Sequence, residues 1–247
     1  LSLSVAYRND PRPDKVDLGI GVYKNSAGET PVMEAIKQAQ DIVVATQTTK
    51  SYVGLAGCEE FNQSMVNLLL SGTAAMDRVA AIQTPGASGA LRMLGDLMKV
   101  AQPDTTVWIS NPSYVNHKPV MEAAGLKVKF YHYFSPETKQ VDVARMLDDL
   151  SKAGPNDVVL LHGCCHNPTG ADIDFAAWQE ITKLSIIKGF MPFVDIAYQG
   201  FGDGLEEDAK GLRYMADNVE EMMITTSCSK NFGLYRERTG AAIVVGK

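Results

Sequence analysis

One lysine stands among hydroxyl groups in the segment 227–238, and an arginine ends that segment. The amine of Lys230 can condense with an aldehyde to form a Schiff base, which requires surroundings that lower its pKa from about 10.4. Ser227, Ser229 and Arg238 supply hydrogen-bond donors, and the planar guanidinium group suits bidentate contact with a phosphate. The segment therefore predicts a site for an aldehyde cofactor that carries a phosphate. The alternative is an ordinary surface lysine in a polar loop.

An acid and a tyrosine follow the apolar run 191–194. Asp195 would end a buried strand, where a carboxylate needs a partner, and a protonated ring nitrogen is such a partner. The carboxylate keeps the ring protonated, so that the ring can withdraw electrons. Tyr198 can donate a hydrogen bond to a phenolate oxygen of the same ring. The alternative for Asp195 is a helix N-cap or a structural hydrogen bond.

Two histidines and two cysteines lie within 162–166, directly after the apolar run 157–161. Such a cluster suggests zinc, but tetrahedral zinc sites use separated ligand pairs, and we do not expect the adjacent Cys164 and Cys165 to face one ion. No metal is therefore predicted. The segment 167–170 is typical of a tight turn after a strand, with the amide of Asn167 projecting into a cleft. Ordinary turn chemistry is the alternative there.

A glycine-rich turn at 86–89 precedes the helical pattern 90–98. The first backbone N–H groups of a helix have no partner within the helix, so those around Ala87 and Ser88 can face a phosphate. Ser88 can also cap the helix, and the two roles are compatible. The glycines at 19 and 21 do not form a dinucleotide fingerprint, because the third glycine and the later acid are missing.

The elements that position these residues follow from short apolar runs that alternate with helical patterns. The runs are continuous, which is typical of strands covered on both faces. They predict an α/β fold with a mostly parallel sheet of about seven strands and helices on both faces. Asn167, Asp195 and Lys230 then fall at or just beyond carboxyl ends of strands, where open sheets bind ligands. The runs are 79–83, 107–110, 128–133, 158–162, 191–196, 223–227 and 241–245.

Two further patterns lie between these runs. The segments 102–104 and 136–139 are interpreted as turn-rich connectors. The acidic segment 204–208 is interpreted as a solvated helix start, because the helix dipole favours acids there.

The motifs and their order resemble the large domain of class I, fold-type I pyridoxal-phosphate (PLP) aminotransferases, in the aspartate and aromatic amino acid aminotransferase subgroup. The resemblance implies that residues 1–247 are the PLP-binding large domain, with part of the N-terminal arm missing. A small C-terminal domain, which carries the arginines for the substrate carboxylates, would lie outside this sequence. The matching segments are 17–23, 48–52, 83–92, 111–118, 162–170, 195–201, 204–209 and 227–240.

The resemblance implies a role for each matching residue. Lys230 would hold the aldehyde carbon of pyridoxal 5'-phosphate and move the proton at the substrate α-carbon. Asp195 would pair with the ring nitrogen, and His166 would support Asp195. Tyr198 and Asn167 would hydrogen-bond to the phenolic oxygen.

The resemblance also implies contacts to the phosphate and the substrate. Tyr52 would reach the phosphate of a neighbouring subunit, which implies a homodimer. Ile20 and the backbone of Gly21 would lie near the substrate. Tyr114 replaces the tryptophan that most members stack on the ring, and with Asn167 it would also contact the substrate. The phosphate would be bound by Ala87, Ser88, Ser227, Ser229 and Arg238.

The implied reaction transfers an amino group from an L-amino acid to a 2-oxo acid in a ping-pong cycle, with aspartate and 2-oxoglutarate as the expected pair. An aromatic amino acid aminotransferase is the alternative within the class, because Tyr114 alters the pocket. A lyase or decarboxylase on the same fold is a second alternative. A domain that binds PLP without turnover is a third.

Composition bounds the remaining possibilities. The 247 residues are 45% hydrophobic and 21% charged, which fits one globular domain. The net charge of -6 argues against nucleic acid as a partner. The sequence shows no signal peptide and no apolar run long enough to cross a membrane, so no membrane partner is expected. The four cysteines form no disulfide framework, which predicts a cytoplasmic protein.

Overall fold

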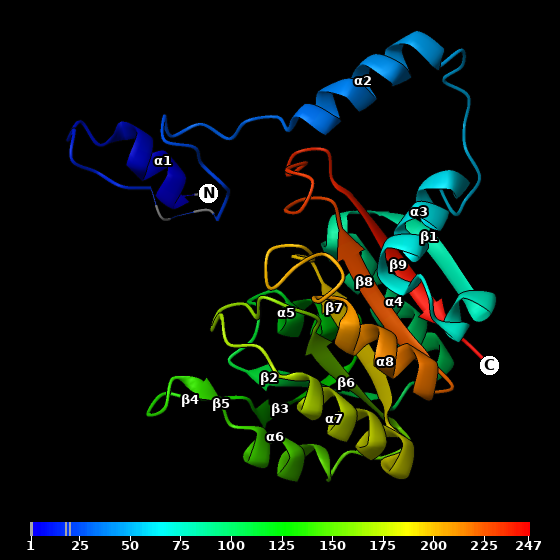
Figure 1. Cartoon of the computed structure of the whole chain (residues 1–247). Helices are drawn as coiled ribbons and strands as arrows, with labels where there is room; N and C mark the ends of the chain where they lie inside the picture. The colour runs from blue at the N-terminus through cyan, green and yellow to red at the C-terminus, as the bar shows by residue number, and fades with distance from the viewer. Residues whose placement is uncertain (1, 18, 20) are drawn as a thin grey trace. The chain divides into compact units, whose positions relative to one another are not determined.

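The computed structural model describes residues 2–17, 19 and 21–247, and the chain divides into two compact units, Leu1–Gln47 and Thr48–Lys247. The first unit contains the helices α1 (Ser2–Asn9) and α2 (Glu34–Thr46) (Figure 1). No residue of α2 is buried. The second unit contains the sheet and its covering helices.

The elements of the second unit alternate between helices and strands. In chain order they are α3 (Glu59–Leu70), the 3-10 helix η1 (Ala74–Arg78), β1 (Val79–Pro85), α4 (Gly86–Ala101), β2 (Thr106–Asn111), α5 (His117–Ala123), β3 (Lys127–His132), β4 (Phe134–Ser135), β5 (Gln140–Val141), α6 (Val143–Leu150), β6 (Asp157–His162), α7 (Phe175–Lys188), β7 (Met191–Ile196), α8 (Lys210–Asn218), β8 (Met222–Ser227) and β9 (Thr239–Val245).

The main sheet has seven strands in the order β1-β9-β8-β7-β6-β2-β3. Strands β8, β7, β6, β2 and β3 pair in parallel, whereas β9 is antiparallel to both of its neighbours. All seven predicted runs are strands, and the predicted α/β class with a mostly parallel sheet is confirmed. A separate hairpin of β4 and β5 encloses the turn predicted at 136–139.

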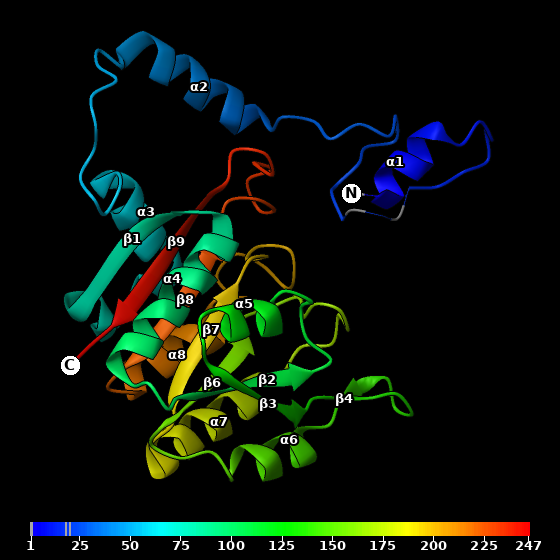
Figure 2. The ribbon, with the colours of Figure 1, turned by 180° about the vertical axis from the view of Figure 1, so that it is seen from behind.

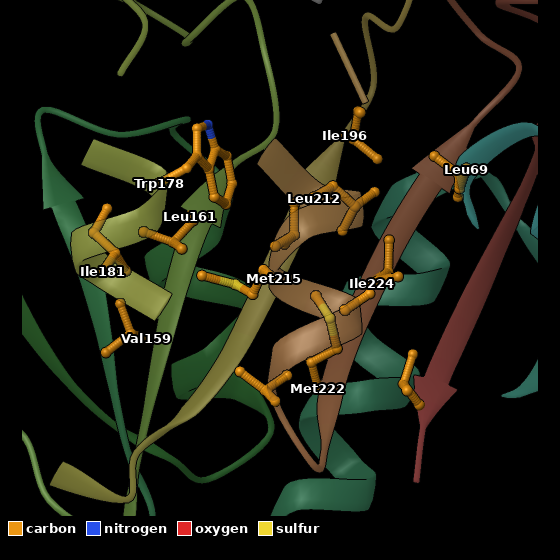
Figure 3. Packing of buried hydrophobic residues seen from close by; sticks show 14 of the residues in the cluster. Leu69, Val159, Leu161, Trp178, Ile181, Ile196, Leu212, Met215, Met222 and Ile224 are labelled. Atoms are coloured by element: carbon orange, nitrogen blue, oxygen red, sulfur yellow. The ribbon is translucent and has the colours of Figure 1, made fainter. Parts of the chain in front are cut away.

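Helices cover both faces of the sheet (Figures 1 and 2). Val159 and Leu161 of β6 belong to the hydrophobic cluster that includes residues of α7 and α8, and Figure 3 shows their packing. The adjacent Val158 and Leu160 belong to the cluster that includes residues of α4 and α5. Because successive strand residues point to opposite faces, a continuous apolar run fills both clusters.

The same alternation places the polar residues that end the strands. Phe193 of β7 and Met223 of β8 belong to the cluster with α4 and α5. Asp195 and Thr225 follow each of them by two positions, so their side chains lie on that same face. Thr226 points to the opposite face. The carboxyl ends of the parallel strands form one edge, and β9 begins at that edge because it runs in the opposite direction.

Helix α7 shows how local signals set the elements between the strands. The side chain of Asp174 accepts a hydrogen bond from the N–H group of Ala177 at 2.8 Å and so caps the first turn. Gly189 ends the helix with φ of 77°, in the left-handed region that favours glycine. Trp178 and Ile181 then pack against the sheet (Figure 3). No helix in the described part of the chain has both the length and the apolar character to span a bilayer.

Candidate active site

The carboxylate of Asp195, at the end of β7, is held by two neighbours. Nε2 of His117 lies 2.8 Å from Oδ2, and Oγ1 of Thr225 donates a hydrogen bond to Oδ1 at 2.8 Å. His117 is completely buried, and its Nδ1 lies 2.9 Å from Oγ of Ser113. Since each carboxylate oxygen has its own partner, the orientation of Asp195 is defined from both sides.

His166 is not the direct partner of Asp195, and its predicted indirect support of Asp195 stays a prediction. Nε2 of His166 lies 3.0 Å from Oγ of Ser110, and its Nδ1 lies 2.8 Å from Oγ1 of Thr169. His117 makes the contact instead. Sequence reasoning missed His117 although it lies in the matching segment 111–118, because nothing in the sequence says that the start of α5 reaches the end of β7.

Two stacked histidines lie beneath this site. The ring centroids of His162 and His166 are 4.0 Å apart. Burial lowers the pKa of His166 to about 4, and the charge of His117 contributes to the shift. Burial also lowers the pKa of His162 well below its ordinary value. Both rings are therefore neutral at neutral pH.

This shift predicts a loss of stability in acid. The unfolded chain protonates His166 near 6.5 and the folded chain only near 4, so the unfolded state binds more protons between these values. The free energy of unfolding should fall as pH drops through this window, by about 3 kcal/mol from His166 alone. Denaturant titrations at several pH values across this window measure the free energy of unfolding. This free energy should depend less steeply on pH in His166→Asn than in wild type. Parallel curves for the two proteins would contradict the assignment.

Lys230 follows β8, and its Nζ lies 5.1 Å from the ring centroid of Tyr198. Burial lowers the pKa of Lys230, the charge of Asp195 opposes this shift, and the charge of Arg238 adds to it. Burial raises the pKa of Tyr198, and a hydrogen bond with Asn167 opposes that shift. Four predicted residues at the ends of three neighbouring strands are therefore linked by these interactions, namely Lys230, Asp195, Tyr198 and Asn167.

Arg238 lies against the start of α4. A Cβ atom added to Gly86 would lie 2.5 Å from Nη2 of Arg238, so glycine permits this close approach. Nη1 of Arg238 donates to Oγ of Ser229 at 3.3 Å. Ser227 and Ser229 are buried, and the N–H group of Ser229 lies 3.4 Å from Oγ of Ser227. The structure thus brings the predicted arginine and serine donors to the first turn of α4.

Helix α4 begins four residues earlier than the sequence pattern indicated, at Gly86 instead of Ala90. Ala87 and Ser88 therefore lie in its first turn, and the predicted cap by Ser88 is wrong because the helix has no side-chain cap. The N–H groups of this turn have no partner within the helix, as the sequence reasoning required. Their position beside Arg238 makes the turn suited to an anion.

Tyr114 lies beside the partner of Asp195. Its ring contacts the His117 ring edge to face, with centroids 5.4 Å apart, and its hydroxyl accepts a hydrogen bond from Nδ2 of Asn116 at 2.9 Å. Tyr52 is fully exposed. Gly21 belongs to the first unit, and its predicted contact with substrate stays a prediction; Ile20 lies outside the described residues.

The side chains of Cys164 and Cys165 were not expected to face one ion, and the structure differs. The Sγ atoms of Cys164 and Cys165 and a carboxylate oxygen of Asp208 all lie within 4.8 Å of one another, so adjacent cysteines can face one point. Burial raises the pKa of both thiols, which keeps them protonated at neutral pH.

Asp208 also corrects the interpretation of the acidic segment. It is buried, and its two oxygens accept hydrogen bonds from the N–H groups of Gly200, Gly202 and Asp203 at 2.8, 3.0 and 2.8 Å. Helix α8 begins only at Lys210. The prediction of a solvated helix start is therefore wrong for Asp208, which stabilises the loop after Tyr198.

Comparisons with known proteins identify the family of this chain. The family described as aminotransferase class I and II matches residues 13–246. The aromatic-amino-acid aminotransferase of Paracoccus denitrificans is 47% identical over 245 residues, which are 99% of this chain and 62% of that protein. The aspartate aminotransferase of Salmonella typhi is 46% identical over 248 residues, which are 99% of this chain and 63% of that protein.

A solved structure shows the same fold. The aromatic-amino-acid aminotransferase from Burkholderia pseudomallei, covalently bound to pyridoxal phosphate, superposes with a TM-score of 0.95 at 36% identity, over 100% of this chain and 62% of that one. The chain thus spans somewhat under two thirds of the length of these relatives. It belongs to the class I and II aminotransferase family.

Proposed function

We propose that the chain binds pyridoxal 5'-phosphate and serves the transfer of an amino group from an L-amino acid to a 2-oxo acid. One arrangement carries the proposal: Lys230 follows β8 with its Nζ 5.1 Å from the Tyr198 ring, Asp195 lies at the end of the neighbouring strand β7, and Arg238 lies against the first turn of α4. Lys230, Asp195 and Arg238 match the cofactor's aldehyde, ring nitrogen and phosphate, in that order. In this proposal residues 1–247 serve as the cofactor-binding large domain.

The residues present fit this cofactor. A phosphate with two negative charges requires several donors, which the hydroxyls of Ser227 and Ser229, the Arg238 guanidinium and the first turn of α4 offer together. The absence of a Cβ at Gly86 lets Arg238 lie against that turn. Asp195 supplies a fixed carboxylate for the ring nitrogen. The hydroxyl of Tyr198 and the amide of Asn167 supply donors for the phenolic oxygen.

When bound, PLP supplies an electrophilic carbonyl carbon and a ring that withdraws electrons from the substrate α-carbon. Nζ of Lys230 can accept a proton from that carbon and return it, because its lowered pKa leaves more of the amine neutral. Asp195 presents negative charge where the ring nitrogen would bind. Arg238 and the serine hydroxyls hold the phosphate end, so the reacting carbon is delivered to Lys230.

The test is a coupled transamination assay with aspartate and 2-oxoglutarate. The proposal predicts oxaloacetate and glutamate in equal amounts, no product without aspartate, and at most one equivalent of oxaloacetate per bound cofactor when 2-oxoglutarate is left out. Release of ammonia or carbon dioxide without the oxo acid would contradict it in favour of a lyase or decarboxylase. No turnover with a bound cofactor would favour a domain that only binds PLP.

Aromatic amino acids are the alternative substrates. A relative named for aromatic amino acids and one named for aspartate are almost equally similar to this chain. Tyr114 lies next to His117, where its ring can shape the pocket. The ratio of kcat/KM for aspartate to that for phenylalanine separates the two substrate classes, and we expect the higher kcat/KM for aspartate.

A homodimer is part of the proposal. The side chains of Tyr52 and Leu55 are fully exposed in the extended segment before α3, and Val53 is largely exposed. Burial against a second copy would remove these apolar surfaces from water, and Tyr52 would then reach the neighbouring phosphate. Light scattering should give twice the monomer mass, and Tyr52→Phe should weaken cofactor binding.

The free state of all four cysteines supports a cytoplasmic location.

Replacement of Arg238 by alanine should weaken cofactor binding. A charged hydrogen bond contributes about 1.5 to 3 kcal/mol, so the Kd for PLP should rise about 10- to 100-fold. Titration by absorbance measures this change. Arg236→Ala, two positions away and also exposed, is the matched control and should leave the Kd unchanged. Equal affinities of the two variants would contradict a phosphate contact by Arg238.

A further inference from the structure

Thr225 stands directly opposite Asp195 in the sheet. The two residues are paired in the parallel register of β7 and β8, and Thr225 is completely buried. Its Oγ1 donates to Oδ1 of Asp195 at 2.8 Å. Both side chains lie on the sheet face covered by α4 and α5. This hydroxyl is therefore part of the immediate surroundings of the carboxylate.

The two partners of Asp195 divide its oxygens between them. His117 contacts only Oδ2. The last torsion of an aspartate side chain is broad, so one contact would leave Oδ1 free to swing. The hydrogen bond from Thr225 restricts this rotation of the carboxylate. Thr225 is β-branched, so its own first side-chain torsion is stiff. A hydrogen bond to a charged acceptor is also stronger than a neutral one.

We propose that Thr225 is a positioning residue that fixes the plane of the Asp195 carboxylate for its contact with the ring nitrogen of PLP. The inference rests on the proposed function. The alternative explanation is that the hydroxyl of Thr225 bonds to Asp195 only because a buried hydroxyl needs a partner. In that case its loss would affect stability alone. The two explanations differ in what they predict for the bound cofactor.

The test compares three variants by visible circular dichroism, which reports the orientation of the bound ring, by the Kd for PLP and by steady-state kinetics. Thr225→Val keeps the shape and removes the hydroxyl. It should raise the Kd and lower kcat, each about 10-fold, with KM unchanged and a weaker dichroic band. Thr225→Ser keeps the hydroxyl and should show the wild-type Kd, kcat and dichroic band. Thr226→Val removes a buried hydroxyl from the opposite face and should match wild type.

Two results would overturn the inference. If Thr225→Val matches Thr226→Val in dichroism, Kd and kcat, and only its melting temperature falls, then the hydroxyl serves stability alone. If the wild-type protein develops no visible band with PLP, the proposed function fails and this inference fails with it. The wild-type spectrum therefore distinguishes the two failures.

Discussion

Replacement of Lys230 by alanine should reduce amino transfer by about 10⁴-fold or more, because the variant loses both the covalent attachment point and the proton carrier. Lys230 follows β8 with its Nζ 5.1 Å from the Tyr198 ring, and burial lowers its pKa, which together single it out as this group. Binding of PLP should persist in weakened form, since the phosphate donors remain. Single-turnover absorbance measurements with aspartate check both expectations.

The matched control is Lys183→Ala. Lys183 is an exposed lysine of α7, so its loss removes the same chemical group from a surface position. This variant should retain wild-type rates. A Lys230→Ala protein that transfers amino groups at a comparable rate would show that Lys230 is not the reacting amine.

Replacement of Asp195 by asparagine should lower kcat by about 100- to 1,000-fold, because it removes the negative charge from a preorganised site without changing the shape. The effect should exceed that of Thr225→Val, since Thr225 acts only through Asp195. Asparagine also places an NH₂ group beside either His117 or Thr225, so that partner, which lies 2.8 Å from the carboxylate, must accept instead of donate. Steady-state kinetics with saturating PLP measure the loss.

Asp96→Asn provides the control for this change. Asp96 lies on the surface of α4, where it pairs with Arg92 at 2.8 Å, and surface pairs contribute little to stability. Its variant should keep the wild-type kcat. If Asp195→Asn and Asp96→Asn behaved alike, Asp195 would have no part in the reaction.

The strands could be predicted from the sequence because each apolar run fills a cluster on both faces of the sheet. Val158, Val159, Leu160 and Leu161 alternate between the two clusters, so the run is continuous. The direction of β9 could not be predicted, because an apolar run has the same composition in either direction. The hairpin of β4 and β5 was missed because its strands are two residues long and give no pattern.

The site residues after the strands could also be predicted, since parallel strands bring their carboxyl ends to one edge. Asn167 follows β6, Asp195 lies at the end of β7 and Lys230 follows β8, and they interact through Tyr198 and Asp195. Arg238 reaches the same edge only because β9 runs antiparallel, so its proximity to Gly86 depends on a feature that the composition does not encode.

The partners of Asp195 were beyond the sequence for a different reason. His117 comes from the helix after β2, which is not a neighbour of β7 in the sheet. Thr225 is one threonine of a pair, and only the register of β7 and β8 says which of Thr225 and Thr226 faces Asp195. A shift by one residue would exchange them. Contacts between strands thus require the register, which the pattern of apolar residues leaves open.

The most direct test of the account is to locate the bond between protein and cofactor. The protein is incubated with pyridoxal 5'-phosphate, reduced with borohydride to make the linkage permanent, digested and mapped by mass spectrometry. The account predicts the added mass of the reduced cofactor on the peptide that contains Lys230, and none on that peptide in Lys230→Ala. Modification of a different lysine, or of none, would contradict it.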